Sequence, residues 1–303
     1  MAVRIGVSPI AWQNDDLPEL TAGYSMEQAL REAREIGYAG VERGQRMPGD
    51  TEGLRAYLDA ADLALCGGWC SGNLLVASVE EECAAIRNQV DQFVALGSPC
   101  IVYAECSNTV QGHPNTPVND RPRLSRDEMA AYAAKLSEVA KWSADRGMPM
   151  AYHHHMGTIT ESEDDVDRLM EGSADALGLC FDTGHLLFGG GDVLRTLDRW
   201  GDRIAHVHYK DLRAPVAKSV REDGRSFLDG VIAGAFTVPG DPEGSVDFAA
   251  VTNALRRMDY AGWIVVEAEQ DPAKADPYRY SRMGYEHIAR LCDEAGLPVE
   301  GRA

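Results

Sequence analysis

The chain has 303 residues, of which 45% are hydrophobic and 25% are charged, as is typical of a folded globular protein. Asp and Glu number 48 against 29 Lys and Arg, which gives a net charge of −19. This composition excludes disordered, collagen-like and coiled-coil classes. The negative charge repels phosphate backbones and anionic lipids, so we expect no nucleic-acid or membrane partner.

The cysteines and the first residues of the sequence indicate the cellular compartment. Seven cysteines are scattered without a CxxC pair, so neither a disulfide framework nor a cysteine zinc site is expected. No stretch reaches the ~18–20 apolar residues of a membrane helix, and the first residues, MAVRIGVSPIAW, lack the pattern of a signal peptide. We expect a cytoplasmic protein.

Short β-branched runs alternate with helical segments along the chain. The predicted strands lie at 3–8, 40–43, 64–69, 99–104, 149–154, 177–182, 204–209 and 263–268. The predicted helices lie at 25–36, 51–61, 79–95, 126–146, 162–171, 191–199, 247–258 and 277–294. Eight such alternations predict an α/β fold, a closed (β/α)₈ TIM barrel, as one domain over residues 1–303. The rival, an open doubly wound sheet, lacks its glycine-rich turn after the first strand.

Two connections are longer than a barrel needs. They cover 105–125, after the fourth predicted strand, and 212–246, after the seventh. Long βα loops of a barrel lie on the face that carries the active site, so we predict that both border the site. The alternative is a disordered insert, which suits 105–125 better than the partly apolar 212–246.

The last four predicted strands end in polar residues. These are Tyr-His-His-His at 152–155, Asp-Thr-Gly-His at 182–185, His-Val-His-Tyr-Lys-Asp at 206–211 and Glu-Ala-Glu-Gln-Asp at 267–271. The carboxyl ends of barrel strands meet at one mouth, and residues two apart share a face. Imidazole and carboxylate together suit a divalent transition metal such as Mn²⁺, Co²⁺, Fe²⁺ or Zn²⁺. The pattern predicts a metal site, although each residue alone also suits a hydrogen-bonded core position or a solvated rim.

Other catalytic motifs are absent from the sequence. It contains neither a GxSxG nucleophile elbow nor an HExxH pair. Lys210 could form a Schiff base, but its polar neighbours favour a binding role.

The order of these strand ends resembles the xylose-isomerase-like superfamily, which includes sugar epimerases and endonuclease IV. Many members end strand five in Glu-x-His, strand six in Asp-Thr-x-His, strand seven in His-x-His and strand eight in Glu. Over nearly the whole chain the sequence is similar to the inosose dehydratase family. The segments that carry this resemblance are SPIAWQNDDLPEL (8–20), YHHHMGTITE (152–161), DTGHLLFGGGD (182–192), HVHYKDLR (206–213), SFLDGVIAGAFTVPGD (226–241) and GWIVVEAEQDP (262–272). The last two segments are the most specific.

The resemblance implies a divalent metal, Mn²⁺ or Co²⁺, and its ligands. The matching positions are His153, Asp182, His208 and Glu267. Here His153 replaces the strand-five glutamate of the superfamily pattern, so His155 or Glu161 stays open as the ligand from this region. The resemblance also implies a dependence on glutathione, although no feature of the sequence itself marks a glutathione site.

The implied reaction is the loss of water from 2-keto-myo-inositol (scyllo-inosose), giving a trihydroxycyclohexane-dione in myo-inositol catabolism. A base removes the proton beside the ketone, a Lewis acid stabilises the enediolate, and an acid protonates the departing hydroxyl. The candidate acid and base residues are Glu267, Glu269, His155 and His185. The candidate substrate contacts are Lys210, Arg213, Trp12 and Trp69, and core packing is the alternative for both tryptophans.

Three rival functions remain at this point. A sugar or inosose isomerase or epimerase of the same superfamily would move a proton without losing water. An apurinic endonuclease would need a cationic DNA-binding face, which the charge of −19 disfavours. A non-catalytic sugar-binding barrel would not need four convergent ligands. The expected partner is a small polyol ketone, and assembly as a homo-oligomer is left open.

Overall fold

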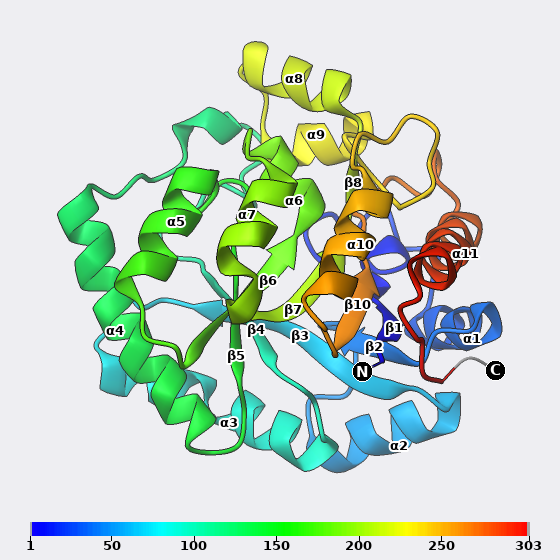
Figure 1. The fold of residues 1–303 in the computed structure, drawn as a ribbon, viewed down its shortest axis with the longest axis horizontal. Helices are drawn as coiled ribbons and strands as arrows, with labels where there is room; N and C mark the ends of the chain where they lie inside the picture. The colour runs from blue at the N-terminus through cyan, green and yellow to red at the C-terminus, as the bar shows by residue number, and fades with distance from the viewer. Residues whose placement is uncertain (1, 302–303) are drawn as a thin grey trace.

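In the computed structural model, which describes residues 2–301, eight parallel strands close into a barrel (Figure 1). They are β1 (Arg4–Val7), β2 (Gly40–Arg43), β3 (Ala64–Gly72), β4 (Ile101–Glu105), β5 (Met150–His153), β6 (Leu177–Asp182), β7 (Ile204–Tyr209) and β10 (Trp263–Val266). Neighbours in the chain pair with one another, and β1 closes the ring against β10. The predicted TIM barrel is confirmed, and the open sheet is wrong.

Helices surround the strands (Figure 1). Those that match predicted helices are α1 (Met26–Ile36), α2 (Thr51–Ala61), α3 (Val79–Leu96), α4 (Arg126–Ala144), α5 (Glu163–Gly172), α7 (Val193–Trp200), α10 (Phe248–Arg257) and α11 (Pro277–Ala295). Capping boxes fix where three of them begin, at Ser78, Ser125 and Ser162. Local sequence signals therefore decide where these helices start.

The connection over 212–246 is more structured than the predicted loop. It contains α8 (Ala214–Glu222) and α9 (Phe227–Ala233), and a short antiparallel pair, β8 (Asp211–Leu212) with β9 (Phe236–Thr237), brackets them. Phe227, Val231 and Phe236 are buried in a separate apolar cluster. α8 and α9 lie together at the top of Figure 1. A further short helix, α6 (Thr183–Phe188), was also not predicted.

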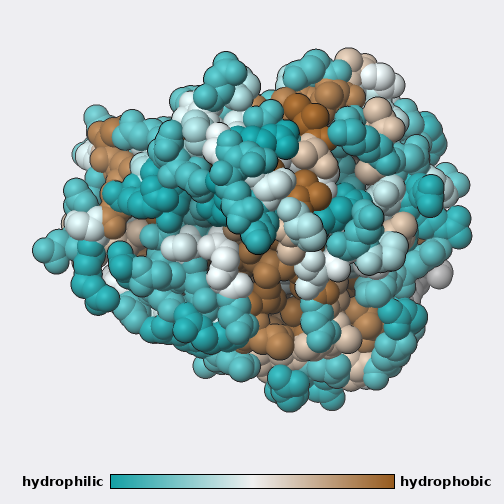
Figure 2. All heavy atoms as spheres, turned by 90° about the horizontal axis from the view of Figure 1, so that it is seen from above, coloured by the Kyte–Doolittle hydropathy of each residue, from teal (hydrophilic) through white to brown (hydrophobic). Residues whose placement is uncertain are grey.

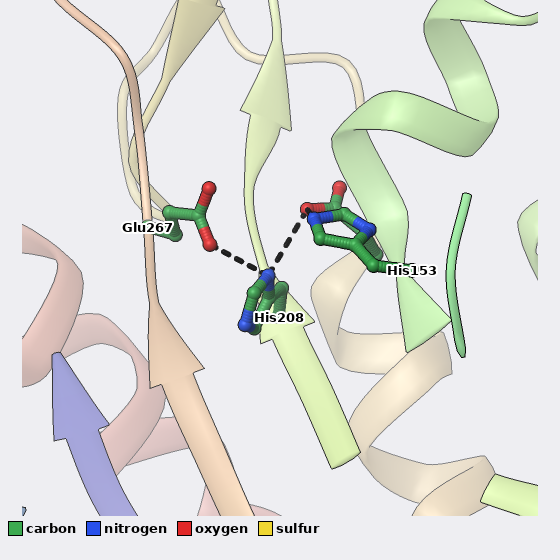
Figure 3. A group of neighbouring side chains, drawn as sticks. His153, His208 and Glu267 are labelled. Carbon is green, nitrogen blue, oxygen red and sulfur yellow. Dashed lines mark ion pairs between the residues drawn. The ribbon is translucent and has the colours of Figure 1, made fainter. Parts of the chain in front are cut away.

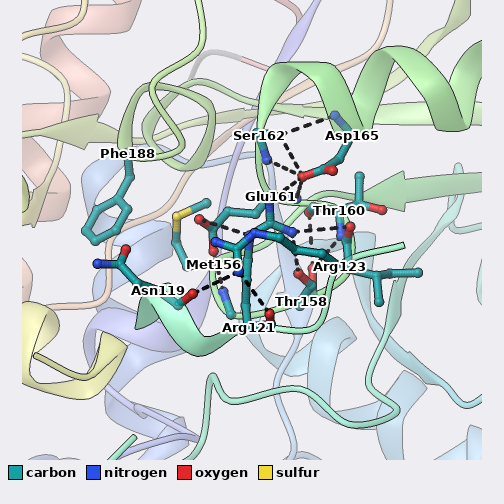
Figure 4. A network of polar contacts seen from close by, with 12 residues as sticks. Asn119, Arg121, Arg123, Met156, Thr158, Thr160, Glu161, Ser162, Asp165 and Phe188 are labelled. Atoms are coloured by element: carbon teal, nitrogen blue, oxygen red, sulfur yellow. Dashed lines mark hydrogen bonds and ion pairs between the residues drawn. The ribbon is translucent and has the colours of Figure 1, made fainter. Parts of the chain in front are cut away.

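The connection over 105–125 is held by buried ion pairs (Figure 4). Arg121 Nη2 lies 2.6 Å from Asp165 Oδ2, and Arg121 Nε lies 3.4 Å from Glu161 Oε1. Arg221 of α8 contacts the same Glu161 oxygen at 2.6 Å. Regular structure in this connection is limited to a 3₁₀ turn, η2 (Val118–Asp120). The ion pairs anchor the segment to both α5 and α8.

Small apolar side chains fill the barrel below its mouth. Cys100, Val102, Ala151 and Cys180 form one buried cluster there. All seven cysteines are free, as predicted. Burial raises the pKa of the Cys180 thiol to about 11, so this cysteine is a core residue and not a nucleophile.

The outside of the molecule carries mostly hydrophilic residues on the face shown in Figure 2, with apolar atoms gathered in patches. None of the helices within residues 2–301 has the length and apolar character needed to cross a membrane. The segment before β1 contacts the segment after α11, where the Val3 amide donates to the Pro298 carbonyl at 2.8 Å.

Candidate active site

Two imidazoles and two carboxylates meet at the carboxyl ends of the last four barrel strands. They belong to His153 on β5, Asp182 on β6, His208 on β7 and Glu267, which directly follows β10. One ligand atom from each lies within 4.8 Å of the others, and all four residues are buried. His208 Nδ1 is 2.6 Å from Glu267 Oε2 and 3.4 Å from Asp182 Oδ2. Figure 3 shows His208 between Glu267 and His153.

These atoms are arranged as metal ligands are. Asp182 Oδ2 and His208 Nδ1 are buried, and neither makes a hydrogen bond within the described residues. The short contact between His208 and Glu267 is an ion pair when His208 is protonated, and a bound cation would take the place of that proton. Two nitrogen and two carboxylate oxygen ligands suit a divalent transition metal. The four residues therefore fit such an ion.

The charges beside this group fit a divalent ion as well. Lys210 Nζ lies 2.9 Å from Glu267, 2.7 Å from Glu269 and 3.6 Å from Asp182. Lys210 offsets one of the three negative charges, and a divalent ion would offset the other two. Burial alone would lower the pKa of Lys210, but the carboxylates raise it above its ordinary value. Burial would raise the pKa of Asp182 and Glu269, but Lys210 lowers both.

A carboxylate on β2 orients His208. Glu42 Oε1 accepts hydrogen bonds from Nε2 of His208 at 3.0 Å and from Nε2 of His206 at 2.9 Å. Because Nε2 of His208 donates to Glu42, Nδ1 is the nitrogen that would bind a metal beside Asp182 and Glu267. Burial alone would raise the pKa of Glu42, but the two imidazoles lower it below its ordinary value.

The barrel makes room for Glu42 through a bulge in β3. The pairing register shifts between Val41 and Glu42, so that Glu42 lies opposite Gly67. A Cβ on Gly67 would lie 3.2 Å from Glu42 Oε1 and 3.3 Å from the His206 ring. The φ of Gly67, 150°, is one that other residues rarely adopt. Glycine at this position therefore lets Glu42 and the imidazoles share the barrel interior.

A second group of buried side chains lies beside the first. His155, His185 and Glu269 each offer one atom within 4.8 Å of the others. Glu269 Oε1 lies 3.8 Å from His155 Nε2 and 3.6 Å from His185 Nε2. Lys210 Nζ donates to His185 Nε2 at 2.7 Å. Burial, together with Lys210, lowers the pKa of His185 to about 4, so His185 is neutral at pH 7.

His155 is the imidazole of this second group that reaches the cavity at the mouth of the barrel. Its Nδ1 is 3.0 Å from the Met156 carbonyl oxygen. Because a carbonyl only accepts, we assign the proton to Nδ1, which leaves Nε2 facing Glu269. Trp69 and Phe227 pack against the ring with centroid distances of 5.5 and 5.1 Å. The connection after β7 therefore packs against His155 through Phe227, although none of its residues lines the cavity.

The cavity has a volume of about 180 Å³, which suits a small molecule. His153, His155, His208, Glu267 and Glu269 line one part of it. The rest is lined from the first four strands and their connections, by residues that include Asp15, Asp16, Arg43, Trp69, Ser71 and Gln111.

Comparison with known proteins places this site in a family. A family model described as a xylose isomerase-like TIM barrel matches residues 30–298. The chain is 40% identical to the inosose dehydratase of Geobacillus thermodenitrificans, over 96% of this chain and 97% of that protein. The chain belongs to the inosose dehydratase family of xylose isomerase-like TIM barrels. It is also 43% identical to the rhizopine catabolism protein MocC of Rhizobium meliloti, over 98% of this chain and 91% of that protein.

A solved structure shares the fold of this family member. The crystal structure of the IOLI protein with a bound zinc atom matches with a TM-score of 0.70, over 97% of this chain and 99% of that one. The two sequences are 13% identical, so the likeness concerns the fold alone. The resemblance drawn from the motifs is confirmed by the relatives and by the family model.

The structure brings most of the predicted site residues of this family member together, but not all of them. Trp69 lines the cavity, whereas Trp12 is fully buried in the core and its indole donates to Glu32 at 2.6 Å. Arg213 is held away from the cavity by Asp241 and by the Gly234 carbonyl. Neither Trp12 nor Arg213 is therefore placed to touch a substrate in the cavity.

Two further expectations concern residues near the metal group. Lys210 is fully buried behind the cavity wall, where it contacts carboxylates and His185 instead of the cavity. Glu161, the alternative ligand, accepts from the Gly157 amide at 2.8 Å and pairs with Arg221. These contacts turn Glu161 away from the four-residue group, in which β5 is represented by His153.

Glu42 is a site residue that the sequence analysis did not predict, and the cavity-lining Asp16, Arg43 and Gln111 were not predicted either. The available signal for Glu42 was its place near the carboxyl end of a predicted strand, followed by Arg43, in a position where a barrel puts active-site groups.

Proposed function

We propose that this protein is a hydro-lyase that converts 2-keto-myo-inositol to a trihydroxycyclohexane-dione and water in myo-inositol catabolism. The observation that carries the proposal is a four-ligand group facing a small cavity, with His155 and Glu269 beside it and free of that group. Relatives named inosose dehydratase, about 40% identical over nearly the whole chain, support the substrate.

His153, Asp182, His208 and Glu267 would hold the metal, for which we propose Mn²⁺ or Co²⁺. A divalent ion there would supply a Lewis acid that stabilises the negative charge developing on the substrate oxygens. The zinc atom bound by the structurally similar IOLI protein is in keeping with a divalent ion in this fold.

His155 removes the proton from the carbon beside the ketone. It lines the cavity, and its Nε2 holds the lone pair because Nδ1 donates to a backbone carbonyl. Glu269 Oε1, 3.8 Å from Nε2, stabilises the imidazolium that forms. Lys210 keeps Glu269 ionised and fixes its second oxygen at 2.7 Å. This arrangement gives a base whose charged form is stabilised as soon as it forms.

The same imidazolium returns the proton to the hydroxyl on the next carbon, which leaves as water. The electrons of the broken C–H bond are first held in an enediolate, and they form the new C=C bond when the C–O bond then breaks. Tautomerisation of the resulting enol gives the dione. Trp69 and Phe227 pack against His155 and hold its ring in place. His185, neutral and bonded to Lys210, holds the positions of Lys210 and Glu269.

Two further expectations, on the cellular compartment and on glutathione, belong to this proposal. The cytoplasm suits a chain whose seven cysteines are free. The glutathione dependence implied by the family resemblance stays a prediction, to be tested by assaying the metal-loaded protein with and without glutathione.

The test is an assay of 2-keto-myo-inositol with protein that has been stripped by a chelator and reloaded with single metals. The expected result is a metal-dependent rise in the ultraviolet absorbance of a conjugated dione, with a product lighter by one water. A product of unchanged mass would replace the dehydratase by an epimerase or isomerase. No reaction with any of the metals would overturn the proposal.

A further inference from the structure

Three polar side chains line the cavity without a side-chain hydrogen bond to another of the described residues. They are Asp16, in the connection after β1, Arg43, at the end of β2, and Gln111, in the connection after β4. Arg43 Nε and Gln111 Oε1 are buried without a hydrogen-bond partner in the described part of the chain. Asp16 makes its hydrogen bond through its backbone amide, to Asn14 at 2.9 Å. Such unpaired groups are rare in folded proteins, and beside a cavity they point to a ligand.

Backbone contacts order the chain at Arg43 and at Gln111. Arg43 belongs to β2 and is paired in register with Gly68 of β3. The backbone amide of Gln111 donates to Thr109 Oγ1 at 3.2 Å. The Thr109 hydroxyl in turn donates to the Gly157 carbonyl at 2.9 Å. These two side chains are therefore presented by an ordered rim.

The unpaired groups match the hydroxyls of a polyol. Adjacent hydroxyls both donate and accept hydrogen bonds, so a carboxylate can accept from two of them and a guanidinium can donate to two. The amide of Gln111 can do either. Two acids, Asp15 and Asp16, accompany the single cation Arg43 on this part of the wall. The wall therefore favours a neutral ring over one that carries a carboxylate.

We propose that Asp16, Arg43 and Gln111 bind the ring hydroxyls that lie away from the metal ligands and so select a neutral cyclic polyol. The inference rests on the proposed function, because it assigns the substrate contacts of the same cavity.

The experiment pairs variants with substrates that lack single hydroxyls. Asp16→Ala and Arg43→Met are assayed with 2-keto-myo-inositol and with each of its monodeoxy analogues. Each variant should raise KM for the parent substrate ~10–100-fold, the range of a lost hydrogen bond to a charged group. The analogue that lacks the hydroxyl bound by the mutated residue should show no further loss in that variant. Glu19→Gln, an exposed acid in the same connection as Asp16, is the matched control and should leave KM unchanged.

A binding measurement separates this inference from the proposed reaction. Inositol, which has no ketone to react, is titrated into the metal-loaded proteins by calorimetry. Weaker binding to Asp16→Ala and Arg43→Met supports the inference even if the wild type fails to dehydrate the ketone, a result that would sink the reaction alone. The inference would be overturned if the variants kept the wild-type inositol affinity and KM. It would also be overturned if, for every analogue, the effect of the mutation and the effect of the missing hydroxyl simply added. If a cyclic ketone that carries a carboxylate displaced inositol from the wild-type protein at equal concentration, the selection of a neutral ring would be contradicted.

Discussion

The two halves of the barrel mouth differ in how their polar side chains are satisfied. On the side of β5, β6, β7 and β10, buried imidazoles and carboxylates lie within a few ångströms of one another around Lys210. On the side of β1 to β4, Asp16, Arg43 and Gln111 border the same cavity, and Arg43 Nε and Gln111 Oε1 have no hydrogen-bond partner among the described residues. In the first half, the side chains satisfy one another's charges and hydrogen bonds except for the charge that a cation would supply. In the second half, we propose that a ligand supplies the missing hydrogen bonds.

This difference separates chemistry from recognition. Proton transfer and charge stabilisation need groups that are already oriented before the substrate arrives, and a buried network supplies that orientation. Recognition gains most from groups that pair only when the right hydroxyls enter the cavity. Glu42 is the exception, because it lies on β2 but orients His208 on the opposite half.

The largest effect is expected from Asp182→Asn, which keeps the shape of a fully buried ligand but removes its charge. Metal affinity and turnover should both fall by more than the ~100-fold that accompanies loss of a group behind the ligands. Metal content measured by mass spectrometry, together with the dehydration assay, checks this. Asp198→Asn, an exposed acid on α7, is the control. Full metal occupancy and full turnover in Asp182→Asn would show that the chemistry does not depend on this half of the mouth.

His155→Gln should lower kcat by ~10²–10⁴-fold, the usual contribution of a positioned acid or base, while metal content stays at the wild-type level. Glu269→Gln should act in the same direction, because it removes the charge that stabilises the imidazolium. Exposed His113 offers the matched control, His113→Gln. If His155→Gln raised KM and left kcat unchanged, His155 would belong with the recognition residues and the division of the mouth would be wrong.

Glu42→Gln tests a hydrogen bond that crosses between the halves. The amide keeps a hydrogen-bond acceptor but loses the charge that orients His208, so metal affinity should weaken by ~10–100-fold. Titration of stripped protein with Mn²⁺ or Co²⁺ measures the change. A variant with wild-type metal affinity would mean that Glu42 serves only to fill the barrel.

The smallest effect is expected in the pH dependence of stability. The pKa of His185 is about 4 in the folded protein against an ordinary value of 6.5. Between these values the unfolded chain binds more protons, so His185 contributes stability above pH 6.5 that is lost as the pH falls towards 4. In chelator, urea unfolding of the wild type should therefore weaken more steeply over this range than that of His185→Gln. Parallel pH profiles for the two proteins would contradict a neutral, buried His185.

The fold was predictable because its signals are local. Alternating strand and helix patterns, with caps such as Ser125 before α4, place the eight strands and eight of the helices. The short helices were missed because they are too brief to show a clear helical repeat, although local caps begin α6 and α9. In α6, for example, Asp182 is both a predicted ligand and the cap, accepting from the His185 amide at 2.8 Å.

Site residues could be predicted from the sequence where polar residues cluster at strand ends. They could not be predicted where their role depends on contacts between distant parts of the chain. His208 and Glu42 are 166 residues apart, and no local pattern connects them. Strand alternation also could not show that Trp12 faces the core or that Lys210 is enclosed by carboxylates. Both outcomes depend on how neighbouring strands and loops pack around the barrel.

Solvent deuterium exchange at the carbon beside the ketone tests the division of labour most directly. With saturating 2-keto-myo-inositol and bound metal, the wild type, Asp16→Ala and Arg43→Met should incorporate deuterium at similar rates, while His155→Gln should lose exchange by ~10²–10⁴-fold. Exchange that survives in His155→Gln but disappears in Asp16→Ala or Arg43→Met at saturation would contradict the account.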